Sequence, residues 1–373
     1  MMILELTMNM EDKMAGNKLF DKLKKLDGAV INSGYNHKQH CIRSQSPSVN
    51  WAFAIEGGGI PKGFSGVFYG PPKGGKSLLV NSMVAQLHKD DPEAVAINFN
   101  TELRGAIQCS ADAMVKWGID PERYMVFDVN QPELIFDRIE HDIAALCEEG
   151  LKVGMVIIDS LTHIQGRRTM NATSVNQQQI GDHAQTISVG LKRILPVMRK
   201  YGIALIATDH VRAELDQHEI MRGNTVKMSS SGAAKHVFEF FGYVEPNKTK
   251  DGRVSLAGEE FVDKEVVDFM KKGQKTGHKL RFTIKESSFG KAGRVAEFTL
   301  DYDKGIINQY EEIYTLGVQY GVIERPNNVT YKYKDENYRG LASILTALKD
   351  NEIMQKEVLD AVWMKEYGIP YYR

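Results

Sequence analysis

The sequence predicts an α/β protein whose core is a mostly parallel, twisted sheet with helices on both faces. Helical patterns fill most of the intervals between short apolar runs, for example across residues 134–146. Strands and helices that alternate in this way are typical of βαβ units, which build a parallel sheet covered on both sides. Five such runs are the predicted strands: residues 67–69, 95–99, 124–127, 156–158 and 203–207.

The pattern changes after residue 237. Residues 279–285 and 295–301 predict two strands that add an antiparallel edge to the otherwise parallel sheet. Beyond them the sequence is mainly helical in pattern, with a short β segment around residues 331–334. We therefore expect the last part of the chain to differ in structure from the strand–helix repeat before it.

Length sets the expected number of domains. The chain has 373 residues, of which 42% are hydrophobic and 25% charged. Because one core usually serves about 100–200 residues, we expect one large domain with smaller attachments. Residues 1–48 are expected to hold a short amphipathic helix and a polar linker over 33–48. Residues 49–304 would form the main domain and 305–373 a small C-terminal α/β domain.

Composition argues against several classes of protein. The three cysteines lie far apart, so neither a disulfide framework nor a structural zinc site is expected. No apolar run approaches the ~20 residues of a membrane helix, and the N-terminus does not resemble a signal peptide. We expect a protein of the reducing cytosol with no membrane partner. The net charge of −1 gives no support for nucleic-acid binding, which must rest on local charge.

Residues 70–77 match G-x-x-x-x-G-K-[ST], the pattern of a phosphate-binding loop. An apolar strand precedes the loop and helical spacing follows it, so backbone N–H groups and a helix dipole would face one anion. Lys76 would reach the β- and γ-phosphates, and the Ser77 hydroxyl would ligate Mg²⁺. A chance glycine-rich turn is the alternative. The residues predicted to bind the nucleoside triphosphate are Gly70, Pro71, Pro72, Lys73, Gly74, Gly75, Lys76, Ser77 and Leu78.

Polar residues end three further strands of the predicted sheet. Because the carboxyl ends of parallel strands face the ligand crevice, Asp159 is expected to hold Mg²⁺ together with Ser77. Glu102 would orient the attacking water, although its segment also fits a helix N-cap. His210 is expected to end its strand and contact the γ-phosphate, although an ordinary core or surface histidine fits equally well.

In this order, these elements resemble the RecA-type recombinases, and among them the UvsX recombinases of T-even-like bacteriophages. The resemblance runs from about residue 49 to the C-terminus; residues 55–63 resemble the family's approach to the phosphate loop and 180–182 the core of its first DNA-binding loop. It implies a RecA-type P-loop ATPase core with ATP and Mg²⁺ as ligands. The catalytic residues that it implies are Glu102, Lys76, His210 and, acting on a neighbouring subunit's ATP, Lys285.

The chain also departs from that family. Extra residues between Glu102 and Gly118 leave the aromatic residue that stacks on adenine unassigned. Lys285 stands as one cation where relatives offer a pair to the neighbouring subunit. The acidic tail of relatives is missing, which puts autoinhibition by such a tail in doubt.

Two long polar segments, 165–182 and 211–232, are predicted to be DNA-binding loops. Loops of this length are usually functional or disordered, and cations, amides and hydroxyls suit phosphate oxygens. Charge alone would also fit solvated loops, whereas the resemblance favours DNA. Without an aromatic platform we expect little sequence preference. The predicted contacts are Arg167, Arg168, Gln178, Gln179, Ile180, Gly181, Arg212, Arg222, Lys227, Ser229, Ser230, Ser231 and Gly232.

The resemblance implies an ATP-dependent DNA strand-exchange recombinase. Such a protein is a DNA-dependent ATPase that forms a head-to-tail helical filament on single-stranded DNA, pairs it with homologous duplex DNA, and serves recombination, recombination-dependent replication and repair. A helix around residues 19–26 would dock on the next subunit, although a plain surface helix fits its pattern equally well. Single-strand-binding and mediator proteins are implied partners, in the cytoplasm of a bacterial host or a phage replication compartment within it. A RecA-fold ring helicase and a non-recombining ATP-switched mediator or signalling ATPase remain as alternatives.

Overall fold

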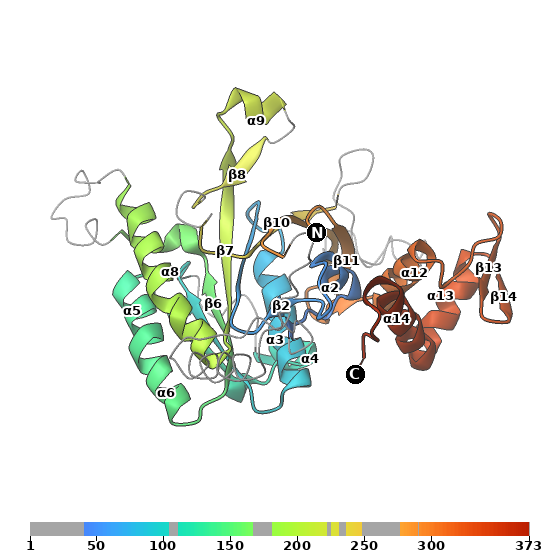
Figure 1. Cartoon of the computed structure of the whole chain (residues 1–373), viewed down its shortest axis with the longest axis horizontal. Coiled ribbons are helices and arrows are strands. Elements are labelled where there is room, and N and C mark those ends of the chain that lie inside the picture. The colour runs from blue at the N-terminus through green and yellow to red at the C-terminus, as the bar shows by residue number, and fades with distance from the viewer. Residues whose placement is uncertain are drawn as a thin grey trace, which may run out of the picture. The chain divides into compact units, whose positions relative to one another are not determined.

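A large mixed sheet organises the part of the chain that the structure describes (Figure 1). The computed structural model describes residues 41–103, 111–166, 181–221, 225–230, 236–247, 277–289 and 291–372. All of them belong to one compact unit, Gln39–Arg373. Within it the strand order is β12-β11-β10-β9-β3-β7-β6-β4-β5, with β8 paired to β7.

The described strands are β1 (Cys41–Ile42), β2 (Ile60–Pro61), β3 (Ser65–Gly70), β4 (Val95–Asn100), β5 (Tyr124–Asp128), β6 (Val153–Asp159), β7 (Ala204–Ala213), β8 (Val226–Met228), β9 (Phe240–Pro246), β10 (Gly277–Ser287), β11 (Val295–Asp301), β12 (Gly305–Ile307), β13 (Thr330–Tyr333) and β14 (Glu336–Arg339). The α-helices are α2 (Pro47–Ala52), α3 (Lys76–Asp90), α4 (Ala111–Trp117), α5 (Pro132–Asp137), α6 (Ala144–Glu148), α8 (Asp182–Tyr201), α9 (Gln217–Met221), α12 (Gln309–Gln319), α13 (Leu341–Asp350) and α14 (Glu352–Tyr367). Shorter or irregular turns are η2 (Pro121–Arg123), the π-helix η3 (Arg138–Ile143) and η4 (Leu161–His163).

The predicted α/β class is confirmed. The five predicted strands are β3 to β7, and neighbouring members of this group pair in parallel. The predicted antiparallel pair is β10 and β11, although the short β12 rather than β11 is the outermost strand. β9 was not predicted from the sequence; it pairs in parallel with β3 and antiparallel with β10 and so joins the two parts of the sheet.

Side chains alternate between two cores, one on each face of the sheet. Phe68 packs with the core that contains α3, whereas its neighbour Val67 packs with the core that contains α5 and α8. Figure 1 shows α5, α6 and α8 together on one side of the central strands and α3 on the other. Successive side chains point to opposite faces of the sheet. Because both faces are buried, most positions are apolar and the strands form near-continuous apolar runs in the sequence. The arrangement leaves the strand ends free to carry polar groups.

The expected polar linker over 33–48 is wrong for its last residues. Residues 41–42 form β1, which pairs with β2, and Ser46 caps α2 by accepting a hydrogen bond from the Val49 N–H at 3.1 Å. Ser44, Ser46 and Ser48 are buried. A serine-rich composition suggested solvent exposure, but here the hydroxyls satisfy buried polar groups.

One of those groups is Glu312 in the first turn of α12. Its Oε2 accepts hydrogen bonds from the Ser46 hydroxyl at 2.5 Å, the Ser48 hydroxyl at 2.6 Å and the Ser48 N–H at 3.0 Å. Burial raises the pKa of Glu312 to about 7, against the effect of these three donors. We call this contact between α2 and α12 the α2–α12 junction.

Residues 305–373 contain α12, α13, α14 and the β13–β14 hairpin, as the sequence suggested. Their apolar side chains share a core with the main sheet: Trp363 is fully buried, and its indole N–H donates to the Glu56 carbonyl at 3.1 Å. The boundaries at residues 48 and 304 stay predictions. Among the described helices, none combines the length and apolar character needed to cross a membrane.

His210 does not end its strand, which corrects the sequence analysis. β7 continues to Ala213 and pairs antiparallel with β8 from Val211↔Met228 to Ala213↔Val226. The predicted loop 211–232 therefore contains a β-hairpin with α9 near its tip. In Figure 1 this hairpin, which we call the β7–β8 arm, projects beyond the sheet.

Candidate nucleotide-binding site

The phosphate-loop sequence has the expected strand–turn–helix geometry. It leaves β3 at Gly70 and enters α3 at Lys76. Gly75 has φ of +89°, and a Cβ atom at that position would lie 2.6 Å from Leu280 Cδ1. Only glycine adopts this conformation without strain in so close a contact. The turn therefore brings the N-terminus of α3 against β10.

Lys76 is buried inside the loop. Its Nζ donates to the carbonyl oxygens of Gly70 at 3.1 Å and Pro71 at 3.0 Å. Burial lowers the pKa of Lys76, and the nearby carboxylates of Asp159, Glu102 and Asp209 oppose that shift. The lysine is thus a cation held at the loop, with three acidic groups from other strands close enough to act on it.

A cavity of about 420 Å³ opens beside the loop. Its size is within the usual range for small-molecule sites, about 300–1,000 Å³. Glycine backbone at the N-terminus of a helix, a lysine and a hydroxyl fit a triphosphate chemically. The residues that line it are Pro72, Lys73, Gly74, Gly75, Lys76, Ser77, Leu78, Glu102, His210, His278 and Tyr302.

Asp159, the last residue of β6, offers the second oxygen group for a divalent cation. It is half-buried, and the Thr208 hydroxyl donates a hydrogen bond to its Oδ1. Oxygen ligands from a carboxylate and a serine hydroxyl suit Mg²⁺, so Asp159 and Ser77 fit the predicted metal site. Their roles stay predictions.

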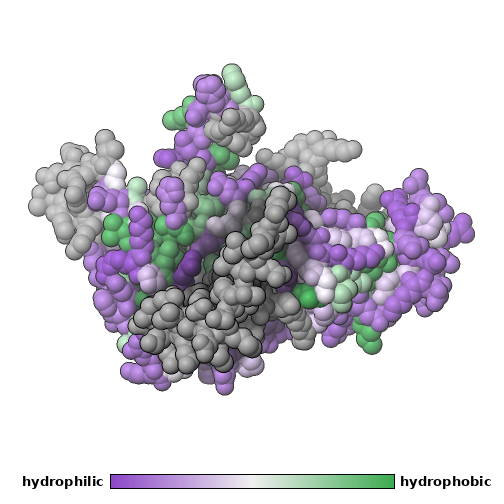
Figure 2. All heavy atoms as spheres, in the orientation of Figure 1, coloured by the Kyte–Doolittle hydropathy of each residue, from purple (hydrophilic) through white to green (hydrophobic). Residues whose placement is uncertain are grey.

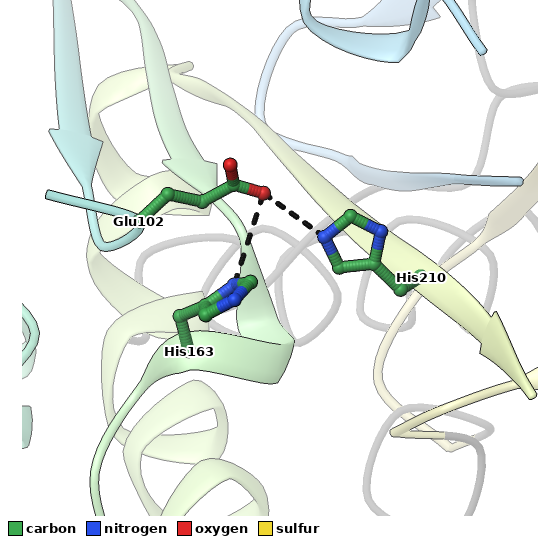
Figure 3. A group of neighbouring side chains, drawn as sticks. All are labelled: Glu102, His163 and His210. Atoms are coloured by element: carbon green, nitrogen blue, oxygen red, sulfur yellow. Dashed lines mark hydrogen bonds and ion pairs between the residues drawn. The ribbon is translucent and has the colours of Figure 1, made fainter. Parts of the chain in front are cut away.

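Glu102 lies between two imidazoles, as Figure 3 shows. Its Oε1 is 2.9 Å from His210 Nε2 and 3.8 Å from His163 Nδ1. Thr101, which the sequence also allowed as a helix cap, instead uses its hydroxyl on the Ser160 backbone at 2.6 and 2.7 Å. These two hydrogen bonds connect the turn after β4 to the end of β6 and so fix the position of the backbone next to Glu102.

His210 is placed where the sequence analysis expected a phosphate contact. It lines the cavity, and its Nδ1 is buried without a hydrogen-bond partner among the described residues. The residue before it, Asp209, is fully buried, and this burial raises its pKa. Asp209 Oδ2 accepts a hydrogen bond from the Ser230 N–H at 2.8 Å.

Two residues that line the cavity were missed by the sequence analysis. Tyr302 follows β11 and His278 lies in β10, and the tyrosine hydroxyl is 3.1 Å from His278 Nδ1. Both lie about 200 residues from the phosphate loop along the chain, so no local motif joins them to it. An aromatic ring in the wall of this cavity is the kind of group that the sequence analysis left unassigned.

Lys285 lies outside this cavity. It is exposed on β10, at an irregularity in the pairing with β9 between Ile284 and Glu286, and its Nζ lies 5.6 Å from the centre of the Tyr243 ring. A bulge of this kind re-aims a side chain away from the regular ladder. Lys285 therefore does not reach the phosphate loop of its own chain, and its role on a neighbour stays a prediction.

The structure describes only some of the predicted DNA contacts. Arg212 is exposed near the end of β7, opposite Lys227, which pairs with Glu214 at 2.6 Å. The Ser229 N–H donates to the His210 carbonyl at 2.8 Å, and Ser230 is buried against Asp209. Gly181 precedes α8 with φ of +87°. Outside the described residues lie Arg167, Arg168, Gln178, Gln179, Ile180, Arg222, Ser231 and Gly232.

The β7–β8 arm also exposes apolar side chains. Leu215 is 80% exposed and Met221 82% exposed. Figure 2 shows apolar atoms among hydrophilic ones on this projecting arm.

Comparison with known proteins gives consistent matches. The family model of the RecA N-terminal domain matches residues 16–307. Protein RecA of Gloeobacter violaceus is 23% identical over 339 residues, which cover 89% of this chain and 80% of that protein. Protein RecA of Pseudomonas putida is 23% identical over 337 residues, with 89% and 83% covered. Protein RecA of Pseudomonas fluorescens is 24% identical over 330 residues, with 87% and 83% covered.

Proposed function

Because this chain belongs to the RecA family, we propose that it is an ATP-dependent DNA strand-exchange recombinase, of the phage UvsX type. In this proposal it binds ATP with Mg²⁺, assembles head to tail on single-stranded DNA and pairs that strand with homologous duplex DNA. The observation that carries it is the meeting of Lys76, Glu102 and His210 at one cavity. Single-strand-binding and mediator proteins would be partners, in a bacterial cytoplasm or a phage replication compartment.

Each cavity residue has a chemical role in this proposal. Lys76 would place its positive charge on the phosphates, and Glu102 would orient a water molecule and accept its proton. His210 holds the Glu102 carboxylate at 2.9 Å, so its ring and that carboxylate would shift together. Ser77 and Asp159 would hold Mg²⁺, which neutralises charge on the phosphates when bound.

Tyr302 supplies the ring that would stack on the nucleotide base. It lines the same cavity as the phosphate loop, and its hydroxyl is fixed by His278 at 3.1 Å. A ring held at one edge loses little further freedom when a base packs on its face. We therefore assign the stacking role to Tyr302.

The β7–β8 arm supports a link between the nucleotide and DNA. His210 in the cavity and Arg212 on the arm are two residues apart on the same strand. A cation on the arm suits the DNA backbone, and the exposed Leu215 and Met221 would insert between bases. Lys285, exposed at the β10 bulge, is available to a neighbouring subunit, where a cation would stabilise charge on transferring phosphate. Nucleotide held between successive subunits of a non-closing interface gives a filament.

The test is ATP hydrolysis with and without single-stranded DNA, together with electron microscopy. We expect DNA to stimulate hydrolysis and ATP to produce long helical filaments. Glu102→Gln should keep nucleotide binding but lower hydrolysis by about 10²–10⁴-fold, because the amide cannot accept the proton. Glu122→Gln, an exposed carboxylate on η2, is the matched control and should hydrolyse ATP normally.

Other outcomes would favour the alternative functions. Closed rings with ATP would support a RecA-fold helicase. Hydrolysis that does not respond to DNA would support an ATP switch that binds proteins. Normal hydrolysis by Glu102→Gln would remove Glu102 from the proposed mechanism.

A further inference from the structure

Two histidines and one glutamate from three different segments of the chain form a cluster with the chemistry of a transition-metal site. Glu102 follows β4, His163 lies in η4 after β6, and His210 lies in β7. Figure 3 shows the two imidazoles turned toward one carboxylate. His163 has no part in the proposed hydrolysis, and the phosphate-loop pattern does not require it.

The distances suit a single ion. One oxygen of Glu102 and one nitrogen from each histidine lie within 4.8 Å of one another, and two of the separations are 2.9 and 3.8 Å. Ligand atoms about 2.1 Å from a tetrahedral Zn²⁺ lie about 3.4 Å apart. Binding an ion would replace the present hydrogen bonds, between His210 Nε2 and Glu102 at 2.9 Å and between His163 Nδ1 and the Ser160 hydroxyl at 2.9 Å, by coordination.

The cluster also has an open side. Glu102 and His210 line the cavity beside the phosphate loop, whereas His163 closes the cluster from η4. Three protein ligands with a fourth position open to a cavity are typical of accessible zinc sites. Imidazole ligands favour Zn²⁺, Ni²⁺ or Cu²⁺ over Mg²⁺, which prefers oxygen, so this site differs in chemistry from the one at Ser77 and Asp159.

We propose that Glu102, His163 and His210 bind a transition-metal dication of the Zn²⁺ class, and that the bound ion blocks ATP hydrolysis. Coordination occupies the Glu102 oxygen that would otherwise accept a proton from water, and it holds the His210 ring that would otherwise contact the γ-phosphate. Binding itself does not depend on the proposed function, whereas inhibition rests on it. The site would make this ATPase sensitive to zinc at concentrations of Mg²⁺ that support hydrolysis.

Zinc binding is tested on the full chain without nucleotide or DNA, by competition with a chromophoric chelator. His163→Ala should lose one bound Zn²⁺, or bind it at least about tenfold more weakly, with His163→Asn behaving alike. His141→Ala, whose side chain is 67% exposed on η3, is the matched control and should bind as the wild type does. About a hundredfold excess of Mg²⁺ should not displace the ion.

Cobalt gives a second readout that is independent of activity. Co²⁺ in a four-coordinate nitrogen and oxygen site absorbs much more strongly than the octahedral aqua ion, so wild type should show that spectrum and His163→Ala should not. Wild-type zinc stoichiometry and affinity in both His163 variants would overturn the proposal, as would an aqua-type cobalt spectrum.

Hydrolysis then separates this proposal from the proposed function. Zn²⁺ should lower the wild-type rate, and the ratio of rates with and without Zn²⁺ should move toward one in His163→Ala. Zinc binding at this cluster in a protein that never hydrolyses ATP would contradict the proposed function alone. DNA-stimulated hydrolysis with no zinc site would contradict the inference alone.

Discussion

Glu102 and Glu312 are two glutamates held by several hydrogen-bonding side chains, yet their surroundings differ. Glu102 faces two imidazoles and lines a cavity of about 420 Å³. Glu312 is fully enclosed at the α2–α12 junction, where serine hydroxyls and an N–H donate to one oxygen. The number of partners does not distinguish Glu102, which has a proposed role in hydrolysis, from the structural Glu312. The open volume beside Glu102, where a substrate can enter, does.

The largest effect should come from the cavity itself. Lys76→Ala removes the buried cation that the loop carbonyls and three carboxylates surround. We expect ATP hydrolysis to fall about 10²–10³-fold or more, since charge on the phosphates loses its main counter-charge. Steady-state hydrolysis measures this. Lys89→Ala, exposed in the last turn of the same helix, is the control; equal rates in both variants would contradict the assignment of the cavity.

At the α2–α12 junction, the contribution to folding stability should depend on pH. Burial holds the pKa of Glu312 at about 7 in the folded chain, above its ordinary value of 4.5. Folding therefore favours the protonated form, so this contribution is fully present below pH 4.5 and is lost as the pH rises through 7. The loss amounts to at most about 3 kcal/mol.

Glu312→Gln should remove that pH dependence. Urea unfolding at several values between pH 5 and 8 would give the free energy of unfolding of variant and wild type. The difference between them should change by up to about 3 kcal/mol across this range. Glu352→Gln, which removes an exposed carboxylate in α14, should leave the wild-type slope unchanged. Parallel pH profiles for Glu312→Gln and wild type would show that the junction carboxyl is not the group that titrates.

A smaller effect is expected at the other wall of the cavity. Tyr302→Ala should weaken nucleotide binding by about 1–3 kcal/mol, the usual contribution of stacking between an aromatic side chain and a base. Tyr302→Phe keeps the ring and loses only the hydroxyl contact with His278, so its Kd for nucleotide should stay close to that of the wild type. Titration with a fluorescent nucleotide measures both. An unchanged Kd for Tyr302→Ala would mean that the base lies elsewhere.

The smallest effect is expected for a substitution on the β7–β8 arm, which tests whether this part of β7 contributes to DNA binding. Arg212→Ala removes one exposed cation from the arm, so the slope of log affinity for single-stranded DNA against log salt should fall by about 0.7. Arg339→Ala, exposed on β14, is the control. Fluorescence anisotropy at several salt concentrations gives the slopes. Equal slopes for Arg212→Ala and wild type would separate this part of the arm from DNA binding.

The elements that could be predicted from the sequence are those whose conformation is set by residues close together along the chain. Apolar runs gave β3 to β7, and the glycine pattern gave the turn at Gly75, where φ is +89°. Glu102 was identified as a polar residue after a strand; His210 was expected at a strand end but lies within β7, and the parallel pairing of the sheet brings the two side chains within 2.9 Å. These successes follow from the shared edge of parallel strands.

The missed features depend on long-range contacts. β9 contains Gly242 and ends at Pro246, which weaken the strand pattern that its neighbours show clearly. Tyr302 reaches the cavity only because β10 and β11 fold back against β9, which pairs with β3. His163 has no motif of its own: the turn of η4 aims it at Glu102. The serines of the α2–α12 junction looked like linker residues because their partner, Glu312, lies more than 260 residues away.

The continuous hydrogen-bonded ladder around His210 has a mechanical consequence. The carbonyl of His210 already accepts from the Ser229 N–H at 2.8 Å, and the pairing of β7 with β8 starts at the next residue. β7 runs without a break from His210 in the cavity wall to Ala213 in the arm, so we expect a shift of the backbone at His210 to move the base of the arm with it. Leu215 and Met221, exposed farther along the arm, would then shift with it.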